Sequence, residues 1–211
     1  INPINGEMYS NIITVLPTLS NDDLAMSYRD GHRFAVYAID DGGDPLENSP
    51  VTFNINGVFY TRTSDSNGNA YLNINLDVGE YIITATNYKG LSVSNKIKIA
   101  KGPSIIKGND IHLITGVDRD YCVVLSGLNN KSIPYAAVKF KCNGAYITAV
   151  TNENGEATLL ISNPPKGEYT IEYEFEGNLN YLPYKSSSTL IVEDHINILE
   201  GKDLKMTYQT T

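Results

Sequence analysis

The strongest constraint on the fold of this chain of 211 residues is an internal repeat. Residues 51–57 (Val-Thr-Phe-Asn-Ile-Asn-Gly) return as residues 138–144 (Val-Lys-Phe-Lys-Cys-Asn-Gly), a displacement of 87 positions. Residues 64–68 (Ser-Asp-Ser-Asn-Gly) return with the same displacement as residues 151–155 (Thr-Asn-Glu-Asn-Gly). A period of this length is the size of one small domain, so the sequence predicts two copies of a unit of about 87 residues.

The two copies and their flanks divide the chain into four expected parts. Residues 21–101 and 102–193 are predicted to be two complete domains. Residues 1–20 are expected to be the end of a preceding repeat or a linker strand; the alternative is that residues 12–15 (Ile-Ile-Thr-Val) are an opening strand of the first complete unit. Residues 194–211 are expected to start a following repeat.

Apolar and polar side chains alternate over short runs, which is typical of half-buried β-strands. In the first copy this pattern predicts strands near residues 23–28, 33–39, 50–56, 58–63, 69–75, 80–86 and 92–99. Asn56-Gly57 separates two of these runs, and Asn143-Gly144 does so in the second copy, which predicts a hairpin with a type I′ turn in each. Short strands at this spacing are typical of an immunoglobulin-like sandwich. The predicted fold class is therefore all-β, with tandem immunoglobulin-like antiparallel β-sandwich domains.

Two tyrosines mark the same place in the two copies. Tyr81 follows a Gly-Glu step, and Tyr169 follows the same step 88 positions later, because one residue is inserted in the preceding loop. A tyrosine that enters a late strand after a glycine turn can donate its hydroxyl proton to upstream backbone, an arrangement called a tyrosine corner. The alternative is that both are ordinary half-buried strand residues, which leaves the fold class unchanged.

The two cysteines are expected to be free thiols. Cys142 continues an apolar series with Val138 and Phe140, so we expect it to act as a small core residue. Cys122 lies between Tyr121 and Val123, and it faces outward if those two residues face the core. A single disulfide stays open, but the two opposite orientations argue against it.

The charge balance excludes some classes of partner. The chain has 16 Lys and Arg residues against 24 Asp and Glu residues, which gives a net charge of −8. The field of such a molecule repels phosphate backbones and anionic lipids. No apolar run approaches the roughly 18 residues of a membrane span. We therefore expect no nucleic-acid partner and no membrane contact in this segment.

No group of residues predicts an active site, a cofactor or a metal site. His32, His112 and His195 fall in three different units or partial units, so no pair of them is placed to bind a metal or to activate a nucleophile. Residues 40–44 (Asp-Asp-Gly-Gly-Asp) offer three carboxylates to calcium, but the matching residues 127–131 (Gly-Leu-Asn-Asn-Lys) lack all three. A solvated acidic turn is the favoured interpretation, and the sequence predicts no enzyme.

One covalent modification has a sequence signal. Asn130 opens an Asn-x-Ser triplet in a predicted loop, which makes it a candidate glycosylation site. An isopeptide bond through Lys96 or Lys107 also stays open, but no spacing identifies the buried acid that such a bond needs.

Several strings in the first copy resemble a known family. They are residues 54–63 (Asn-Ile-Asn-Gly-Val-Phe-Tyr-Thr-Arg-Thr), 65–68 (Asp-Ser-Asn-Gly), 72–76 (Leu-Asn-Ile-Asn-Leu) and 79–84 (Gly-Glu-Tyr-Ile-Ile-Thr). They are similar to the bacterial-type immunoglobulin-like repeat domains of methanogenic archaeal adhesin-like proteins. The resemblance implies a secreted, cell-surface protein without enzyme activity. In such a protein neighbouring repeats form a stalk that displays an adhesive region to other cells or to surface glycans and proteins.

A competing hypothesis makes the repeats themselves the binding part. Aromatic side chains on a flat sheet can stack on sugar rings and are enriched at interfaces. Tyr181 and Tyr184 are the candidate contacts for a glycan or protein ligand, and Tyr60, Tyr88 and Tyr146 are further exposed candidates. Ordinary packing between sheets explains most of these tyrosines equally well.

Overall fold

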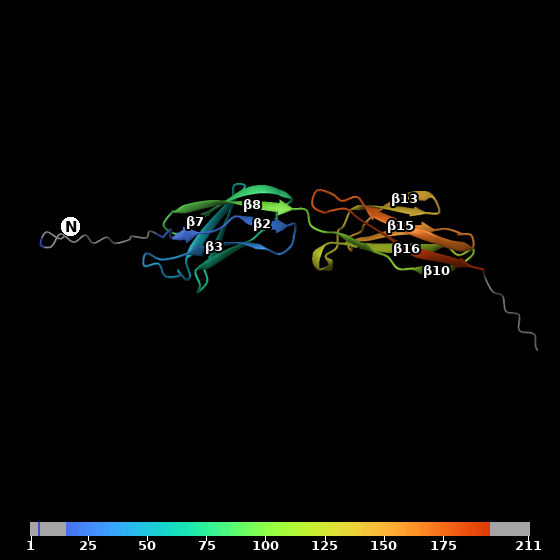
Figure 1. The fold of residues 1–211 in the computed structure, drawn as a ribbon, viewed down its shortest axis with the longest axis horizontal. Coiled ribbons are helices and arrows are strands. Elements are labelled where there is room, and N and C mark those ends of the chain that lie inside the picture. Colours follow the sequence, from blue (N-terminus) through green and yellow to red (C-terminus); the bar gives the residue numbers. More distant parts are fainter. Residues whose placement is uncertain (1–3, 5–15, 195–211) are drawn as a thin grey trace, which may run out of the picture. The chain divides into compact units, whose positions relative to one another are not determined.

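The computed structural model describes residue 4 and residues 16–194. Most of the expected preceding strand, His195 and the expected following repeat lie outside the described residues. The described chain forms two compact units (Figure 1). The first unit comprises the chain up to Gly102 together with Leu179–Tyr181, and the second comprises Pro103–Asn178 and the chain from Leu182 onward.

The first unit consists of two β-sheets. The larger sheet has the order β2 (Leu24–Ser27), β8 (Ser92–Ala100), β7 (Gly79–Thr86), β4 (Pro50–Ile55) and β5 (Val58–Thr63). The smaller sheet has the order β1 (Leu19–Ser20), β3 (Arg33–Ala38) and β6 (Asn69–Asn73). Neighbouring strands are antiparallel except β2 and β8, which are parallel.

The second unit repeats this arrangement strand for strand. Its larger sheet has the order β10 (Ile111–Ile114), β16 (Tyr184–Glu193), β15 (Gly167–Phe175), β12 (Ala137–Cys142) and β13 (Ala145–Val150). Its smaller sheet has the order β14 (Glu156–Ile161), β11 (Arg119–Ser126) and β9 (Ile105–Lys107). One 3-10 turn, Leu128–Asn130, follows β11. The predicted all-β sandwich fold is confirmed, and each unit adds one parallel pair, β2–β8 or β10–β16.

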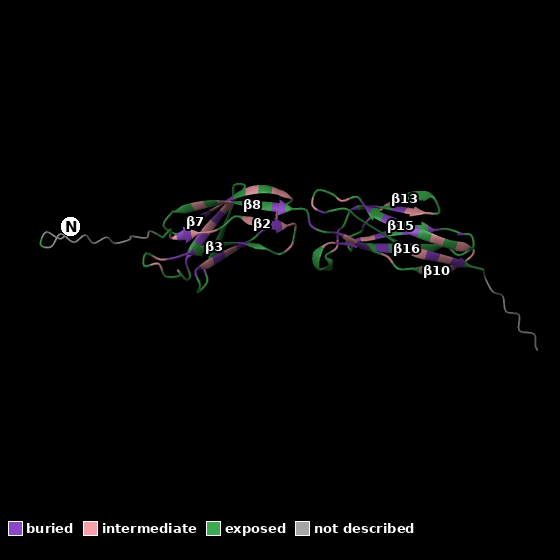
Figure 2. Ribbon diagram, in the orientation of Figure 1, coloured by how far each residue is buried: buried purple, intermediate pink, exposed green. Residues whose placement is uncertain are grey.

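Each sandwich holds its own core between its two sheets. Along β3 exposed and buried residues alternate strictly, and Phe34, Val36 and Ala38 are the buried members. Phe34 packs edge-on against Phe53 of the opposite sheet, with ring centroids 6.1 Å apart. Phe140 and Leu190 are buried in the second unit. Figure 2 shows this alternation as purple and green bands along the strands, so the period of two read from the sequence reports directly which side of each strand faces the core.

The structure corrects the expected start of the first unit. Leu19 pairs with Ala38 and is buried, so residues 19–20 belong to this unit and not to a preceding repeat. In the second unit Ile106 pairs with Leu125 at the matching place. The strands β1 and β9 are only two and three residues long, which is too short for alternation to reveal them.

Candidate functional site

In each unit the first strand of the larger sheet lies parallel beside the last strand, so the chain enters at one end of this pair and leaves at the other. β2 pairs with β8 from Leu24↔Ile97 to Ser27↔Ala100, and β10 pairs with β16 from Ile111↔Leu190 to Ile114↔Glu193. If the chain is pulled from both ends, each pair is pulled in opposite directions along its length. The backbone hydrogen bonds of a pair must then break together, whereas peeling would break them one at a time.

One aspartate fastens each of these pairs. Asp23 Oδ1 accepts hydrogen bonds from the backbone N of Lys96 at 2.8 Å and from Nδ2 of Asn95 at 3.2 Å. Asp110 Oδ1 accepts a hydrogen bond from the backbone N of Thr189 at 2.7 Å. Both aspartates directly precede the first strand of their parallel pair, so the carboxylate extends the strand pairing by one contact. Sequence reasoning did not assign these residues a role, although the signal was the same Asp at equivalent positions of the two copies.

Removing the aspartate contact is expected to weaken its unit. Asp110→Ala should lower the free energy of unfolding of the second unit by about 1 kcal/mol, because a charged acceptor of a backbone N–H is lost. Asp22→Ala removes the same charge from an exposed neighbour of Asp23 and should change stability by less than about 0.5 kcal/mol. Urea unfolding curves of the whole chain measure both effects. Equal effects of the two substitutions would show that net charge matters and the contact does not.

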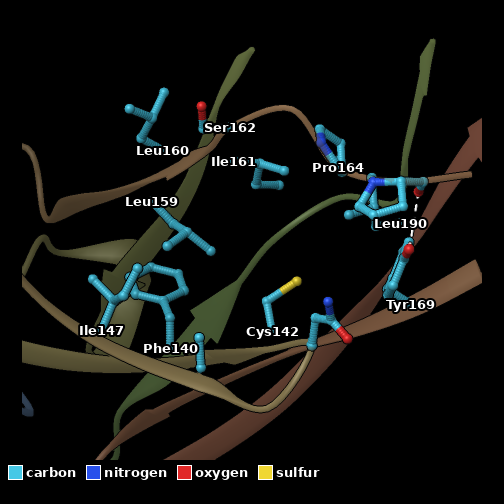
Figure 3. A pocket seen from close by; sticks show the side chains of 13 residues that line it. Phe140, Cys142, Ile147, Leu159, Leu160, Ile161, Ser162, Pro164, Tyr169 and Leu190 are labelled. Carbon is cyan, nitrogen blue, oxygen red and sulfur yellow. Dashed lines mark hydrogen bonds between the residues drawn. The ribbon is translucent and has the colours of Figure 1, made fainter. Parts of the chain in front are cut away.

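The tyrosine corner predicted for both copies is confirmed. The Tyr81 hydroxyl donates to the backbone O of Asp77 at 2.9 Å, and the Tyr169 hydroxyl donates to the backbone O of Pro165 at 2.9 Å. Figure 3 draws the second of these bonds. Both tyrosines therefore fix the loop before the penultimate strand, which is a structural role.

The acidic turn at residues 40–44 is closed by its own side chain. Asp40 Oδ1 accepts hydrogen bonds from the backbone N of Gly42 at 2.8 Å and of Asp44 at 3.0 Å. Asp41 pairs with Nζ of Lys89. Within residues 16–194 no group of three His, Cys, Asp or Glu side chains is placed to hold a metal ion.

The two histidines that the structure describes, His32 and His112, belong to different units. Nδ1 of His32 lies 2.9 Å from Asp30 Oδ1 in the first unit. His112 is an exposed residue of β10 in the second unit. His195 lies outside the described residues.

Both cysteines are free thiols. Cys122 is exposed, as expected from the alternation of β11, whereas Cys142 is half-buried and not part of the closed core. Cys142 departs from the expectation because its cross-strand neighbour Ala145 is small and leaves the thiol at the side of the sandwich. Partial burial raises the pKa of both thiols, and Glu156 adds to this effect at Cys122. Both thiols are therefore harder to ionise than an ordinary cysteine.

The candidate ligand tyrosines are placed differently. Tyr181 is grouped with the first unit, is 8% exposed and packs edge-on against Tyr28 with ring centroids 5.3 Å apart. Tyr184 opens β16 in the second unit and is 38% exposed. Tyr146, on β13, is far more exposed, at 74%. Burial leaves little of the Tyr181 ring for a ligand, and a ligand role for Tyr184 stays a prediction.

Asn130 is accessible to modification. It is exposed and ends the 3-10 turn after β11, with φ of 56°. Its glycosylation stays a prediction.

Comparison with known proteins shows the fold. No family model matches the chain, and no curated protein matches it. Among solved structures, invasin, described as a bacterial integrin-binding protein, aligns with a TM-score of 0.54 and 18% identity over 84% of this chain and 38% of its own. Domains A168–A170 of titin align with a TM-score of 0.53 and 16% identity over 83% of this chain and 65% of theirs. Both units have an immunoglobulin-like fold. No helix in the described part of these immunoglobulin-like units is long and apolar enough to cross a membrane.

Proposed function

We propose that this chain is a non-enzymatic segment of a cell-surface adhesin. Its tandem immunoglobulin-like repeats act as a stalk that spaces and displays an adhesive region for attachment to other cells or surfaces. The observation that carries the proposal is the strand-for-strand identity of the two units, each with its own core. Units that close their own cores can be added one after another without a shared interior.

The parallel strand pairs supply the mechanism. A stalk transmits tension from cell to cell, and each unit presents β2–β8 or β10–β16 in the geometry that resists such tension. The structural likeness to invasin agrees with a place on the outside of the cell, where the partners are surface glycans or proteins and neighbouring repeats. The adhesive contact itself is assigned to other parts of the parent protein.

Single-molecule stretching of the chain by its ends tests the proposal. Two separate unfolding events are expected, because each unit has its own core, and each event should release the length of one unit. Asp23→Ala is expected to lower the force of one event and Asp110→Ala that of the other, because each removes one contact of a sheared pair. A single cooperative event, or forces that neither substitution changes, would contradict the stalk mechanism.

A further inference from the structure

The second unit has an apolar cleft at the open side of its sandwich (Figure 3). The cleft has a volume of about 200 Å³ and lies between β13 and β14, which are the edge strands of the two sheets. Cys142, Ile147, Leu159, Ile161 and Pro164 are among the residues that line it, and none of the described lining residues carries a charge. Figure 3 shows these side chains directed at a common space.

The internal repeat explains why the cleft is open. Cys142 and Ala145 are cross-strand partners in the second unit, and Ile55 and Val58 are the equivalent partners in the first. Both residues are smaller in the second unit. The first unit therefore carries a branched aliphatic pair, with Ile55 buried and Val58 half exposed, where the second unit has only a thiol and a methyl group.

The same change continues along the edge strand. Ile147 takes the place of Tyr60, and Ala149 takes the place of Arg62. Because Ile147 and Ala149 share a side of β13 with Ala145, the whole inward side of this strand carries shorter side chains than that of β5.

The edge of β13 is also open for strand pairing. β13 is the last strand of its sheet, and within the described part of the chain it pairs with β12 alone, in continuous register from Ala137↔Val150 to Cys142↔Ala145. Its sequence, Ala-Tyr-Ile-Thr-Ala-Val, has no charge and no proline, and its register has no bulge, so it lacks the features that usually protect an edge strand. The matching strand β5 carries Arg62.

The turn before β13 determines which backbone groups face outward. Asn143 and Gly144 have φ of 47° and 77°, as a two-residue type I′ turn requires. The residues that flank such a turn exchange backbone hydrogen bonds with each other, and the pattern then alternates along the strand. The backbone N–H and C=O groups of Tyr146, Thr148 and Val150 therefore point away from β12 toward the free edge.

We propose that this edge binds an extended, uncharged peptide segment of another polypeptide. The segment adds a strand to β13, and one of its branched aliphatic side chains enters the cleft. Backbone hydrogen bonds combined with a side-chain pocket are the basis of peptide recognition by strand addition. The uncharged lining matches an uncharged segment, and the aliphatic pair Ile55 and Val58 shows which chemistry fits this place in the fold.

The length of the edge favours a peptide over a second copy of the chain. β13 has six residues, whereas a stable interface between folded proteins uses about 20 to 30 residues on each side. Pairing of β13 with β13 of a second copy alone falls well short of that area. The site is independent of the stalk function and stands whether or not the units act as spacers.

Binding of a designed peptide tests the proposal. The probe is a dye-labelled, uncharged nonapeptide, Ser-Thr-Val-Thr-Ile-Thr-Val-Thr-Ser, titrated with the whole chain and followed by fluorescence anisotropy. We expect saturable binding and slower amide hydrogen exchange at Tyr146, Thr148 and Val150. The double variant Cys142→Ile with Ala145→Val fills the cleft with the residues of the first unit, so it should fold and should bind about tenfold or more weakly.

Matched variants separate the two parts of the site. Thr148→Pro removes an outward N–H without removing a bond to β12, and it should abolish binding. Thr61→Pro at the equivalent position of β5 should leave binding unchanged. Equal binding by the filled variant would overturn the proposal. Equal binding of a peptide that is N-methylated on the residues facing β13 would also overturn it, and would indicate a site for small apolar molecules. Self-association of the chain through β13 that the peptide does not inhibit would overturn it as well.

Discussion

Gly155→Ala is expected to destabilise the second unit by at least about 3 kcal/mol, because strain and a backbone clash add together. Gly155 has φ of +77°, a conformation that residues with a Cβ rarely adopt. A Cβ built on it would lie 2.4 Å from the backbone O of Leu125. That oxygen cannot move away, because the Leu125 backbone N donates to Gly155 O at 2.8 Å and holds the two segments together.

The hairpin glycine of the same unit provides the matched control. Gly144 also has φ of +77°, but a Cβ built on it would have no atom within 4 Å. Gly144→Ala should therefore cost only the conformational part, about 1 kcal/mol. Urea unfolding of the two variants, with hydrogen exchange to assign the loss to the second unit, measures the difference. A difference of less than about 1 kcal/mol would show that the close approach to Leu125 does not determine the choice of glycine.

The features of the fold that depend on residues close together in the sequence could be predicted from it. Alternation along β3 and β4 reports which side chains face the core, and Asn56-Gly57 fixes a turn whose backbone angles few other residue pairs adopt. Because the second copy has matching residues, the same predictions apply to the second unit. Pairing partners are not local, because alternation is the same whichever strand lies alongside. The parallel pairs and the aspartates that fasten them therefore had no signal in a single copy.

The candidate ligand residues could not be ranked from the sequence for a related reason. A tyrosine has an apolar ring and a polar hydroxyl, so it is equally suited to a core edge and to an exposed face. The structure buries Tyr181 and exposes Tyr146, a difference set by tertiary packing. The cleft beside Cys142 also needed the cross-strand register, because only the register shows that its partner is the small Ala145.

The second unit is expected to lose stability relative to the first as the pH rises from about 10 to about 12. Tyr121 is 2% exposed, and its hydroxyl has no hydrogen-bond partner among the described residues. Burial raises the pKa of Tyr121 from 10.0 to about 12; the Ser188 side chain opposes this shift, and the neighbouring Tyr173 and Asp110 add to it. The first unit has Phe34 at the equivalent position and lacks this group.

The direction of this change in stability follows from the raised pKa of Tyr121. Below pH 10 the phenol is neutral in both the folded and the unfolded chain, so its contribution to stability is constant. Between pH 10 and pH 12 the unfolded chain ionises while the folded unit resists ionisation, so stability falls as pH rises through the folded pKa.

Tyr121→Phe should remove this pH dependence, because the variant carries the ring without the ionisable hydroxyl. At neutral pH it should leave the second unit at least as stable as the wild type, since a buried hydroxyl without a partner costs about 1 to 3 kcal/mol of desolvation. Urea unfolding midpoints of both proteins from pH 8 to pH 12 measure the effect, with the exposed Tyr146→Phe as control. The contrary result would be that the unfolding midpoints of the wild type and the Tyr121→Phe variant differ by the same amount at every pH in this range. That result would mean that the Tyr121 hydroxyl reaches solvent and ionises as freely in the folded unit as in the unfolded chain.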